Sequence, residues 1–407
     1  MVAAGHKREP TPCDNPAVPG ERSTKAVGVN LLWLQPGVVG GSETYTVRLL
    51  RGLAERYSDL DYTLFALPEL EGAYPDLTRT FRTVYAPVSG RLKPARVLAG
   101  ENTWLLRQCR RRHIDLVHHA GGTMPFLHAG RQVLTIHDLQ YLYYPEYFTR
   151  SKLAWLRSVV PRSAEAARLV LTPSEFTRRT VIERLGIDPT FVVVVPHGIS
   201  PHESTEEPSD VRKRYDISER FFLYPAVTYP HKNHLLLVNA FARVLKAHPD
   251  VTLVLTGARG STQWGPARST AGAIAQEIRN QGIEERVRPL GYVPHADLIA
   301  LYKGAVALVF PSRFEGFGAP ILEAWAAGCP VIAADSTAIP EVVGDAGYLL
   351  SPDNPEQWAR AMRDLLDDED LRTIYARAGE ARVKEFTWVR SADILEDSYA
   401  HALETTL

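Results

Sequence analysis

Short apolar runs alternate with longer segments of helical period along most of the chain. The runs are about four to eight residues long, the length of a buried parallel strand, and apolar residues recur every three to four positions between them. We expect strands at 27–34, 62–67, 81–87, 116–120, 132–137, 169–172 and 191–195 in the first half, and at 221–227, 251–256, 287–290, 307–310 and 331–334 in the second. The alternation predicts an α/β protein whose parallel sheets are covered by crossover helices.

Helical patterns are clearest at two places in the first half of the chain. In 42–57 apolar residues recur at helical spacing, and 174–185 opens with Ser174, a residue type that caps helix N-termini. Near the C-terminus helices are expected at 355–366, 371–386 and 390–403.

The segment 197–210 interrupts this pattern, because it is rich in Ser, Pro, Glu and His and has no periodicity. It predicts a linker between two Rossmann-like domains, at 26–200 and 201–386, with 387–407 as a helix that crosses back to the first. Residues 1–25 lack an apolar run and contain four prolines. We expect a disordered tail there rather than a signal peptide.

Composition excludes several classes of protein. A length of 407 residues predicts two or three domains, and a net charge of -1 provides no global field for nucleic acid, so no nucleic-acid partner is expected. Cys13, Cys109 and Cys329 form no CxxC pair, which argues against a disulfide framework and a zinc site and favours the cytoplasm. No apolar run approaches the roughly 18 residues of a membrane span.

The chemically most unusual loop follows the strand expected at 307–310. Glu315 lies in this loop and Glu323 about one turn into the next helix. Free backbone N–H groups at that helix start favour anionic or hydroxyl-rich ligands, and a nearby carboxylate can accept hydrogen bonds from a sugar diol. The alternative is that both glutamates are ordinary N-terminal helix charges stabilised by the macrodipole.

The block EGFGAPILEAWAAGCPVIAAD resembles the E-x7-E signature of retaining glycosyltransferases of the GT-B fold, in particular the GT4 family. The resemblance extends from Ala26 to the C-terminus and implies two Rossmann-like domains whose sheets face a cleft, with the acceptor on the first and the donor on the second. In that family the first glutamate and the following amides contact the donor sugar, and the second glutamate holds the ribose. The resemblance therefore assigns the sugar to Glu315, Phe317, Gly318 and Ala319, and the ribose to Glu323.

Lys232, in the loop PAVTYPHKN, can supply a point charge to a diphosphate at a strand end. An exposed lysine at a helix start is an equally good reading of the residues alone. The resemblance favours the phosphate-binding role. Many similar proteins also have an arginine several residues earlier, where this chain has Ala226, so the helix terminus would have to stabilise more of the diphosphate charge.

Two loops of the first half complete the predicted site. Gly40 and Gly41 permit a close turn over a phosphate, which is a weak signal alone, and the resemblance places such a GGxE loop near the diphosphate and the acceptor. His137 ends an expected strand, where it can be a core histidine beside the helix-capping Asp138, or a hydrogen-bonding and acid–base group. The resemblance implies that His137 contacts the donor sugar or the acceptor.

Charged clusters elsewhere call for less specific interpretations. The DxD sequences at 59–61 and 368–370 are interpreted as solvated charge, and no His/Cys cluster has metal-ligand spacing, so no metal or other cofactor is expected. A basic cluster contains Arg107, Arg110, Arg111 and Arg112. A solvated helix face is the slightly favoured interpretation, and the alternative is contact with an anionic membrane surface or a lipid-pyrophosphate acceptor.

Together these features predict a retaining glycosyltransferase that moves a hexosyl group from a nucleotide diphosphate sugar to a hydroxyl of a glycan or lipid-linked acceptor. The segments HDLQYLYYPEYF and PHKNH resemble bacterial mannosyltransferases of surface-polysaccharide assembly, which makes GDP-mannose the first donor to consider. Family resemblance implies same-face substitution, with the departing phosphate accepting the proton. The alternatives are a nucleotide-sugar 2-epimerase of the same fold and a noncatalytic sugar-binding relative.

Overall fold

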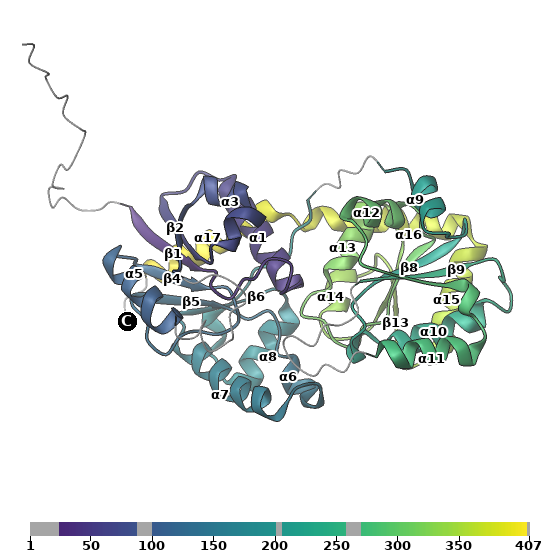
Figure 1. Ribbon diagram of the computed structural model, residues 1–407, viewed down its shortest axis with the longest axis horizontal. Helices are drawn as coiled ribbons and strands as arrows, with labels where there is room; N and C mark the ends of the chain where they lie inside the picture. The colour runs from purple at the N-terminus through teal and green to yellow at the C-terminus, as the bar shows by residue number, and fades with distance from the viewer. Residues whose placement is uncertain (1–23, 88–99, 201–205, 258–269, 405–407) are drawn as a thin grey trace, which may run out of the picture.

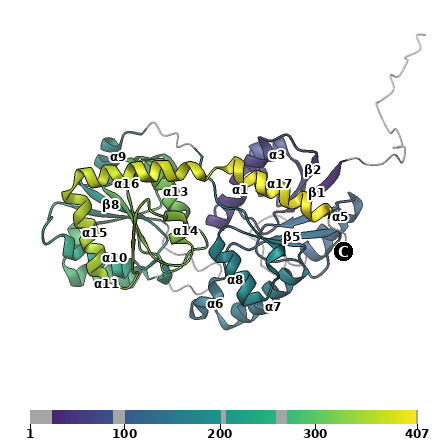
Figure 2. The ribbon, with the colours of Figure 1, turned by 180° about the vertical axis from the view of Figure 1, so that it is seen from behind.

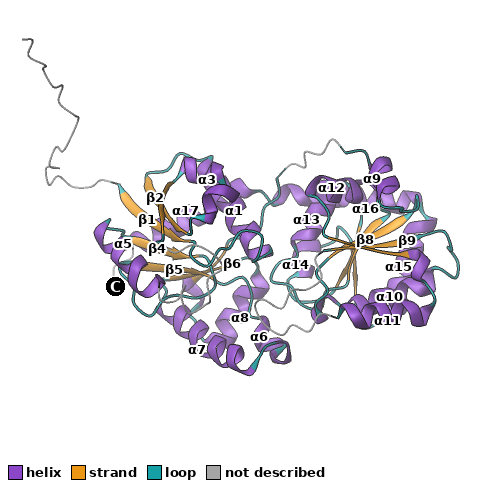
Figure 3. Ribbon diagram, viewed as in Figure 1, coloured by secondary structure: helices purple, strands orange, loops and turns teal. Residues whose placement is uncertain are grey.

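The computed structural model describes residues 24–87, 100–200, 206–257 and 270–404. The predicted tail at 1–25 therefore lies, up to residue 23, outside the described residues. Two sheets lie side by side, each flanked by helices (Figures 1 and 3). Every pairing between neighbouring strands is parallel. The predicted α/β class with two Rossmann-like sheets is confirmed.

The first sheet has seven strands in the order β3-β2-β1-β4-β5-β6-β7. They are β1 (Lys25–Asn30), β2 (Leu60–Ala66), β3 (Arg82–Tyr85), β4 (Leu116–His119), β5 (Arg131–Thr135), β6 (Leu169–Thr172) and β7 (Val192–Val194). The described helices of this half are α1 (Gly41–Ala54), α2 (Glu69–Ala73), α3 (Pro75–Thr80), α5 (Leu106–Arg111), α6 (Gln140–Tyr143), α7 (Arg150–Ala166) and α8 (Glu175–Leu185). A π-helical turn, Glu101–Leu105, precedes α5. Ser174 caps α8 as expected, because its hydroxyl accepts a hydrogen bond from the Thr177 backbone N–H.

The second sheet has six strands in the order β10-β9-β8-β11-β12-β13. They are β8 (Phe221–Pro225), β9 (Thr252–Thr256), β10 (Val287–Gly291), β11 (Ala307–Phe310), β12 (Val331–Ala334) and β13 (Tyr348–Leu350). The described helices of this half are α9 (Pro208–Arg214), α10 (His234–Val244), α11 (Ala271–Gln281), α12 (His295–Gly304), α13 (Ala319–Ala326), α14 (Ile339–Val343), α15 (Pro355–Asp367) and α16 (Glu369–Arg382). All the predicted strands are present, and β13 is an addition, a three-residue edge strand too short to show a pattern.

Several predicted segments differ in extent. The strand expected at 27–34 is β1, which ends at Asn30, and the helix expected at 42–57 is α1, which ends at Ala54. The helix expected at 371–386 begins earlier as α16 and ends at Arg382, followed by a 3-10 turn, Val383–Glu385. The segment predicted as a linker is shorter than 197–210, because α9 begins at Pro208, a residue with the φ angle of a first helical turn.

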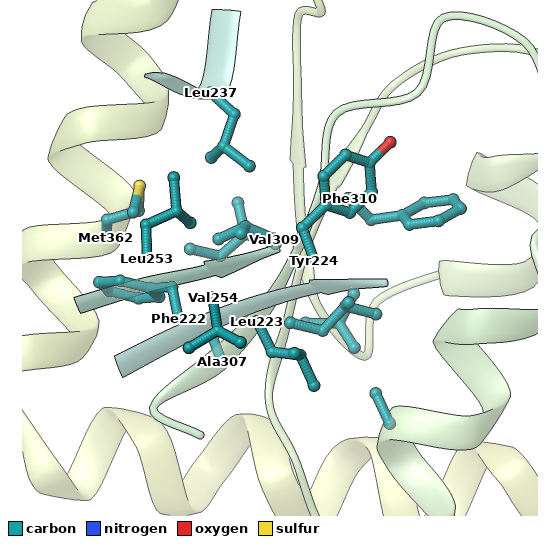
Figure 4. Packing of buried hydrophobic residues seen from close by; sticks show 14 of the residues in the cluster. Phe222, Leu223, Tyr224, Leu237, Leu253, Val254, Ala307, Val309, Phe310 and Met362 are labelled. Carbon is teal, nitrogen blue, oxygen red and sulfur yellow. The ribbon is translucent and has the colours of Figure 1, made fainter. Parts of the chain in front are cut away.

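Alternating strand residues form the core of the second half. Figure 4 shows Met362 of α15 beside Leu253 and Phe222, while Leu223 and Val254 point to the opposite side of the sheet. All five side chains are fully buried. Helices therefore cover both faces, which leaves the carboxyl ends of the parallel strands and their loops as the place for a ligand.

The last helix, α17 (Trp388–Glu404), packs against the first sheet rather than the second (Figure 2). Leu395 and Tyr399 join the same buried cluster as Val27 and Tyr45. The Tyr399 hydroxyl lies 2.7 Å from His118 Nδ1. The first half of the molecule is thus built from both ends of the described chain. Within the described ranges, every helix is too short or too polar to span a membrane.

Candidate functional site

Two loops bring Lys232 and Glu315 together at the carboxyl edge of the second sheet. Lys232 lies between β8 and α10, and Glu315 lies between β11 and α13, neighbouring positions because β8 pairs with β11. Lys232 Nζ donates a hydrogen bond of 2.6 Å to Glu315 Oε1, and the two side chains are 19% and 14% exposed. This buried ion pair therefore places two useful groups side by side. The cation can bind a phosphate, and the carboxylate can accept hydrogen bonds from sugar hydroxyls.

The loop after Glu315 is held by its backbone. The Glu315 backbone N–H donates to Thr337 Oγ1 (3.0 Å), and Gly318 has a φ of 106°, which an L side chain adopts only under strain. Ala319 then starts α13, so the N–H groups of Gly318 and Ala319 precede the intrahelical ladder and can bind an anion or a hydroxyl.

The side chain of Phe317 is buried and packs against His197. Its ring is 5% exposed and stacks on His197 with a centroid separation of 4.5 Å and an interplanar angle of 12°. His197 in turn lies 4.6 Å from the ring of Tyr45, which is on α1. Residue 197 is therefore part of the packing between the two halves, not of a linker, and sequence reasoning missed it because its neighbours lack periodicity.

Glu323 lies on α13 where the two halves meet. Its carboxylate accepts a hydrogen bond of 3.1 Å from the hydroxyl of Tyr302 on α12. Burial raises the pKa of Glu323, and the Tyr302 hydrogen bond and the charges of His295 and Arg48 oppose that rise. Arg48 belongs to α1 of the first half, so the pKa of this carboxylate depends on groups from both domains. Such a carboxylate can accept hydrogen bonds from vicinal hydroxyls.

Ala226 follows β8 in the same loop as Lys232. Its backbone N–H donates to the Thr256 carbonyl (2.9 Å), so this position extends the sheet edge, and its methyl group carries no charge. Lys232 and the N-terminus of α10 are the positive features that this loop offers to an anion.

His137, in the first half, contacts the loop of the second half that carries Glu315. It follows β5, and its Nε2–H donates to the Ala120 carbonyl (2.8 Å), which leaves Nδ1 as the unprotonated nitrogen. Burial lowers the pKa of His137 to about 4, so the ring is neutral at pH 7. A Cβ atom at Gly316 would collide with the His137 carbonyl, so glycine is required there. Asp138 Oδ1 accepts from the N–H of Gln140, the first residue of α6 (2.9 Å), but the N-cap residue of that helix is Leu139.

Gly40 and Gly41 form the start of α1, and Gly40 has a φ of 80°. The loop before them is shaped by Glu43, whose carboxylate accepts hydrogen bonds from the Gly37 N–H (2.8 Å) and from the Tyr74 hydroxyl (2.5 Å). Glu43 is 4% exposed. Its role in folding the loop was not predicted, although a glutamate three residues after a helix N-cap is a known capping signal.

The basic cluster lies on α5, at the end of the first half farthest from the second (Figure 1). Arg107, Arg110 and Arg111 are exposed and Arg112 is half-buried. Cys109 is buried and Leu106 is half-buried, so the fully exposed side chains of α5 are arginines.

The two DxD sequences occupy structural positions. Asp61 lies in β2, and Asp368 caps α16 by accepting from the Leu371 N–H (2.8 Å). Among the described residues, no group of three acidic, His or Cys side chains is arranged to hold a metal ion. Cys109 and Cys329 are buried free thiols.

Comparison with known proteins adds independent findings. A family model described as Glycosyltransferase Family 4 matches residues 39–203, and one described as Glycosyl transferases group 1 matches residues 209–382. The chain is 30% identical over 291 residues to O-antigen chain mannosyltransferase B of Escherichia coli, covering 70% of this chain and 73% of that protein. It is 29% identical over 418 residues to the D-inositol 3-phosphate glycosyltransferase of Kineococcus radiotolerans, covering 91% and 93%. The fold is similar to that of Anabaena HepE in complex with UDP-glucose, with a TM-score of 0.72, 20% identity and coverage of 92% and 99%.

Proposed function

Because the chain belongs to the family 4 glycosyltransferases of the GT-B fold, we propose that it is a retaining enzyme that uses a nucleotide diphosphate sugar. The observation that carries the proposal is the buried pair of Lys232 and Glu315 at one strand edge, with Glu323 on the adjoining helix. In it, the sugar lies at Glu315 and the amides of Phe317, Gly318 and Ala319, and the ribose at Glu323.

Transfer breaks the bond between the anomeric carbon and the diphosphate, and negative charge develops on the leaving group. In our proposal Lys232, the N-terminus of α10 and the Gly40–Gly41 loop stabilise that charge, as fixed dipoles and cations do in a site that excludes water. Because Ala226 adds no charge, Lys232 is expected to account for much of the electrostatic stabilisation. The departing phosphate oxygen then accepts the proton of the attacking hydroxyl on the same face.

His137 is proposed to orient the donor sugar or the acceptor rather than to carry charge. Its Nδ1 can accept a hydrogen bond from a hydroxyl because Nε2–H is held by Ala120. A neutral imidazole suits that role across a wide pH range, since the pKa of His137 is lowered to about 4.

Mannose is the proposed sugar and GDP the proposed nucleotide. Support comes from the O-antigen mannosyltransferases of Escherichia coli and Salmonella typhimurium, to which the chain is similar. HepE, which shares the fold, was solved with UDP-glucose, so uridine donors belong in the same test. A glycan or lipid-linked hydroxyl is the proposed acceptor. No metal or other cofactor is invoked, because Lys232 and helix termini supply the positive charge.

Contact of α5 with an anionic membrane surface is part of the proposal, together with a cytoplasmic location. Because its fully exposed side chains are arginines, α5 would bind mainly by charge, at about 1 kcal/mol per arginine near the surface. Co-sedimentation with phosphatidylserine vesicles should be lost in a variant that replaces Arg107, Arg110 and Arg111 with glutamine. Equal sedimentation with neutral phosphatidylcholine vesicles would contradict the membrane contact.

Thermal unfolding with GDP-, UDP-, ADP- and dTDP-sugars tests the function first. A donor that binds the native state raises the melting temperature by mass action. The shift should disappear in Glu323→Ala and persist in Glu356→Ala, a control on α15 whose carboxylate is 66% exposed. Hexose transfer to an added acceptor must follow for the same donor. Conversion of the donor without an acceptor would support a 2-epimerase, and binding without turnover would support a noncatalytic relative.

A further inference from the structure

One carboxylate of the second half makes its hydrogen bonds entirely across the domain boundary. Glu341, on α14, accepts a hydrogen bond from the Glu175 backbone N–H (3.0 Å) through Oε2 and from the Phe176 backbone N–H (3.2 Å) through Oε1. These are the first two residues of α8, whose N-terminal N–H groups have no acceptor within their own helix. A carboxylate there is also favoured by the helix dipole.

The other groups that affect the Glu341 carboxylate also belong to the first half. Burial raises the pKa of this carboxyl, and the groups that oppose the rise are the N–H groups of Phe176 and Glu175, the Ser174 hydroxyl and the Arg179 charge. All of them belong to the first half of the molecule. The backbone carbonyl of Glu341 is held separately by Arg382 Nη2 (2.9 Å), within the second half.

The same end of α8 also contacts the loop that carries Glu315. Thr177 Oγ1 donates a hydrogen bond of 3.3 Å to the Gly316 carbonyl, one residue after Glu315. Gly316 also lies against the His137 carbonyl, with no room for a Cβ atom. The loop that carries Glu315 is therefore enclosed by α8 and the end of β5, both from the first half.

The place of this contact on the domain boundary determines how strongly it opposes separation of the two halves. The chain passes between the two halves at two places, after β7 on the way to α9 and after α16 on the way to α17, and Figures 1 and 2 show the second of these crossings along one edge of the boundary. The pairing of α8 with α14 lies toward the other edge of the boundary. A contact remote from the crossing between α16 and α17 opposes separation of the two halves more effectively than one beside it.

We infer that Glu341 is a positioning residue, which caps α8 across the domain boundary and thereby holds the Gly316 loop against His137 when the cleft is closed. The inference rests on the proposed function, because the loop so held is the one that carries Glu315. Opening of the cleft would return the N–H groups of Glu175 and Phe176 to water.

Hydrogen exchange on the unliganded protein measures the cap directly. In Glu341→Ala, amide exchange at Glu175 and Phe176 should be about 2- to 5-fold faster than in wild type, the effect of a carboxylate at a helix N-terminus. Glu341→Gln keeps one acceptor oxygen and should be intermediate. Glu356→Gln, a carboxylate that pairs with arginines of its own domain, should leave these amides unchanged. Unchanged exchange in Glu341→Ala would overturn the inference.

Kinetics with GDP-mannose and UDP-glucose separate positioning from mere structural support. Glu341→Ala should lower kcat about tenfold and raise donor hydrolysis relative to transfer, while the Kd for GDP or UDP stays within about twofold of wild type, because the nucleotide site is intact. A melting temperature near that of wild type would confirm folding. Equal kcat in wild type and Glu341→Ala would overturn the role in catalysis. Absence of turnover in wild type with every donor of the GDP-, UDP-, ADP- and dTDP-sugar panel would instead refute the proposed function, and exchange alone would then decide whether the cap exists.

Discussion

Removing the cation from the buried pair at the strand edge should destabilise the unliganded protein. Lys232→Met keeps the aliphatic stem but leaves Glu315, which is 14% exposed, without the ammonium group that lies 2.6 Å from it. A buried carboxylate without a partner loses the hydrogen bond and keeps its desolvation cost. The reverse change, Glu315→Gln, costs less because a lysine can extend its ammonium group to water.

The expected size follows from the exposure of the two side chains. Hydrogen bonds to charged groups contribute about 1.5–3 kcal/mol, and breaking a fully buried pair costs about 3–5 kcal/mol. Since the pair retains some exposure, we expect Lys232→Met to lower the free energy of unfolding by about 2 kcal/mol and Glu315→Gln by about 1 kcal/mol. The double variant should lose about as much as Lys232→Met alone, which corresponds to a coupling energy of about 1 kcal/mol.

Urea unfolding of the wild type, both single variants and the double variant measures this coupling. The assay is to be run without nucleotide, because any ligand that binds the native state would mask the loss. The transitions should be followed by tryptophan fluorescence and by circular dichroism, because a two-domain chain can unfold in two steps. A coupling energy within about 0.3 kcal/mol of zero would refute the argument that the ion pair stabilises the empty site.

Other expected outcomes concern binding, pH and packing. Glu323→Gln should weaken GDP or UDP binding about tenfold, measured by calorimetry, because a charged hydrogen-bond acceptor for the ribose is lost. Burial raises the pKa of Glu101 to about 7, so its stabilising contribution is complete below pH 4.5 and is lost as pH rises through 7. Between those pH values the free energy of unfolding of wild type should fall by about 3 kcal/mol relative to Glu101→Gln, and parallel pH profiles would contradict this. Gly379→Ala should destabilise the fold by about 1–3 kcal/mol, since the added methyl group collides with buried Trp325, and an unchanged melting temperature would disprove that.

Much of the fold follows from periodicity alone. The buried strands of parallel sheets are short apolar runs, and the sequence predicts all of those described except β13. That edge strand has three half-buried residues, so it shows neither an apolar run nor an alternation. Likewise the π-helical turn before α5 differs from an α-helix only in backbone register, which a hydrophobic pattern does not encode.

The candidate site is predictable in its residues but not in its contacts. The positions of Lys232 and Glu315 at strand ends follow from the alternation, and their meeting follows from the pairing of β8 with β11, which no local pattern specifies. Glu341 gave no signal, because a half-buried glutamate on a short helix looks like surface charge until the other domain is placed. His197 was obscured because the residues around it lack periodicity, although its ring packs against residues of both halves.

The helix α17 has a consequence for how the protein is made. Tyr45 and Tyr399 belong to one buried cluster, so the first sheet is completed by residues that are translated after the whole second half. At about 5–20 residues per second, the ribosome adds the roughly 200 residues of the second half in about 10–40 s. During that interval the nascent first half exposes the apolar surface that α17 will cover, while the second half can already fold. Because this apolar surface is exposed during synthesis, the emerging first half is expected to bind chaperones.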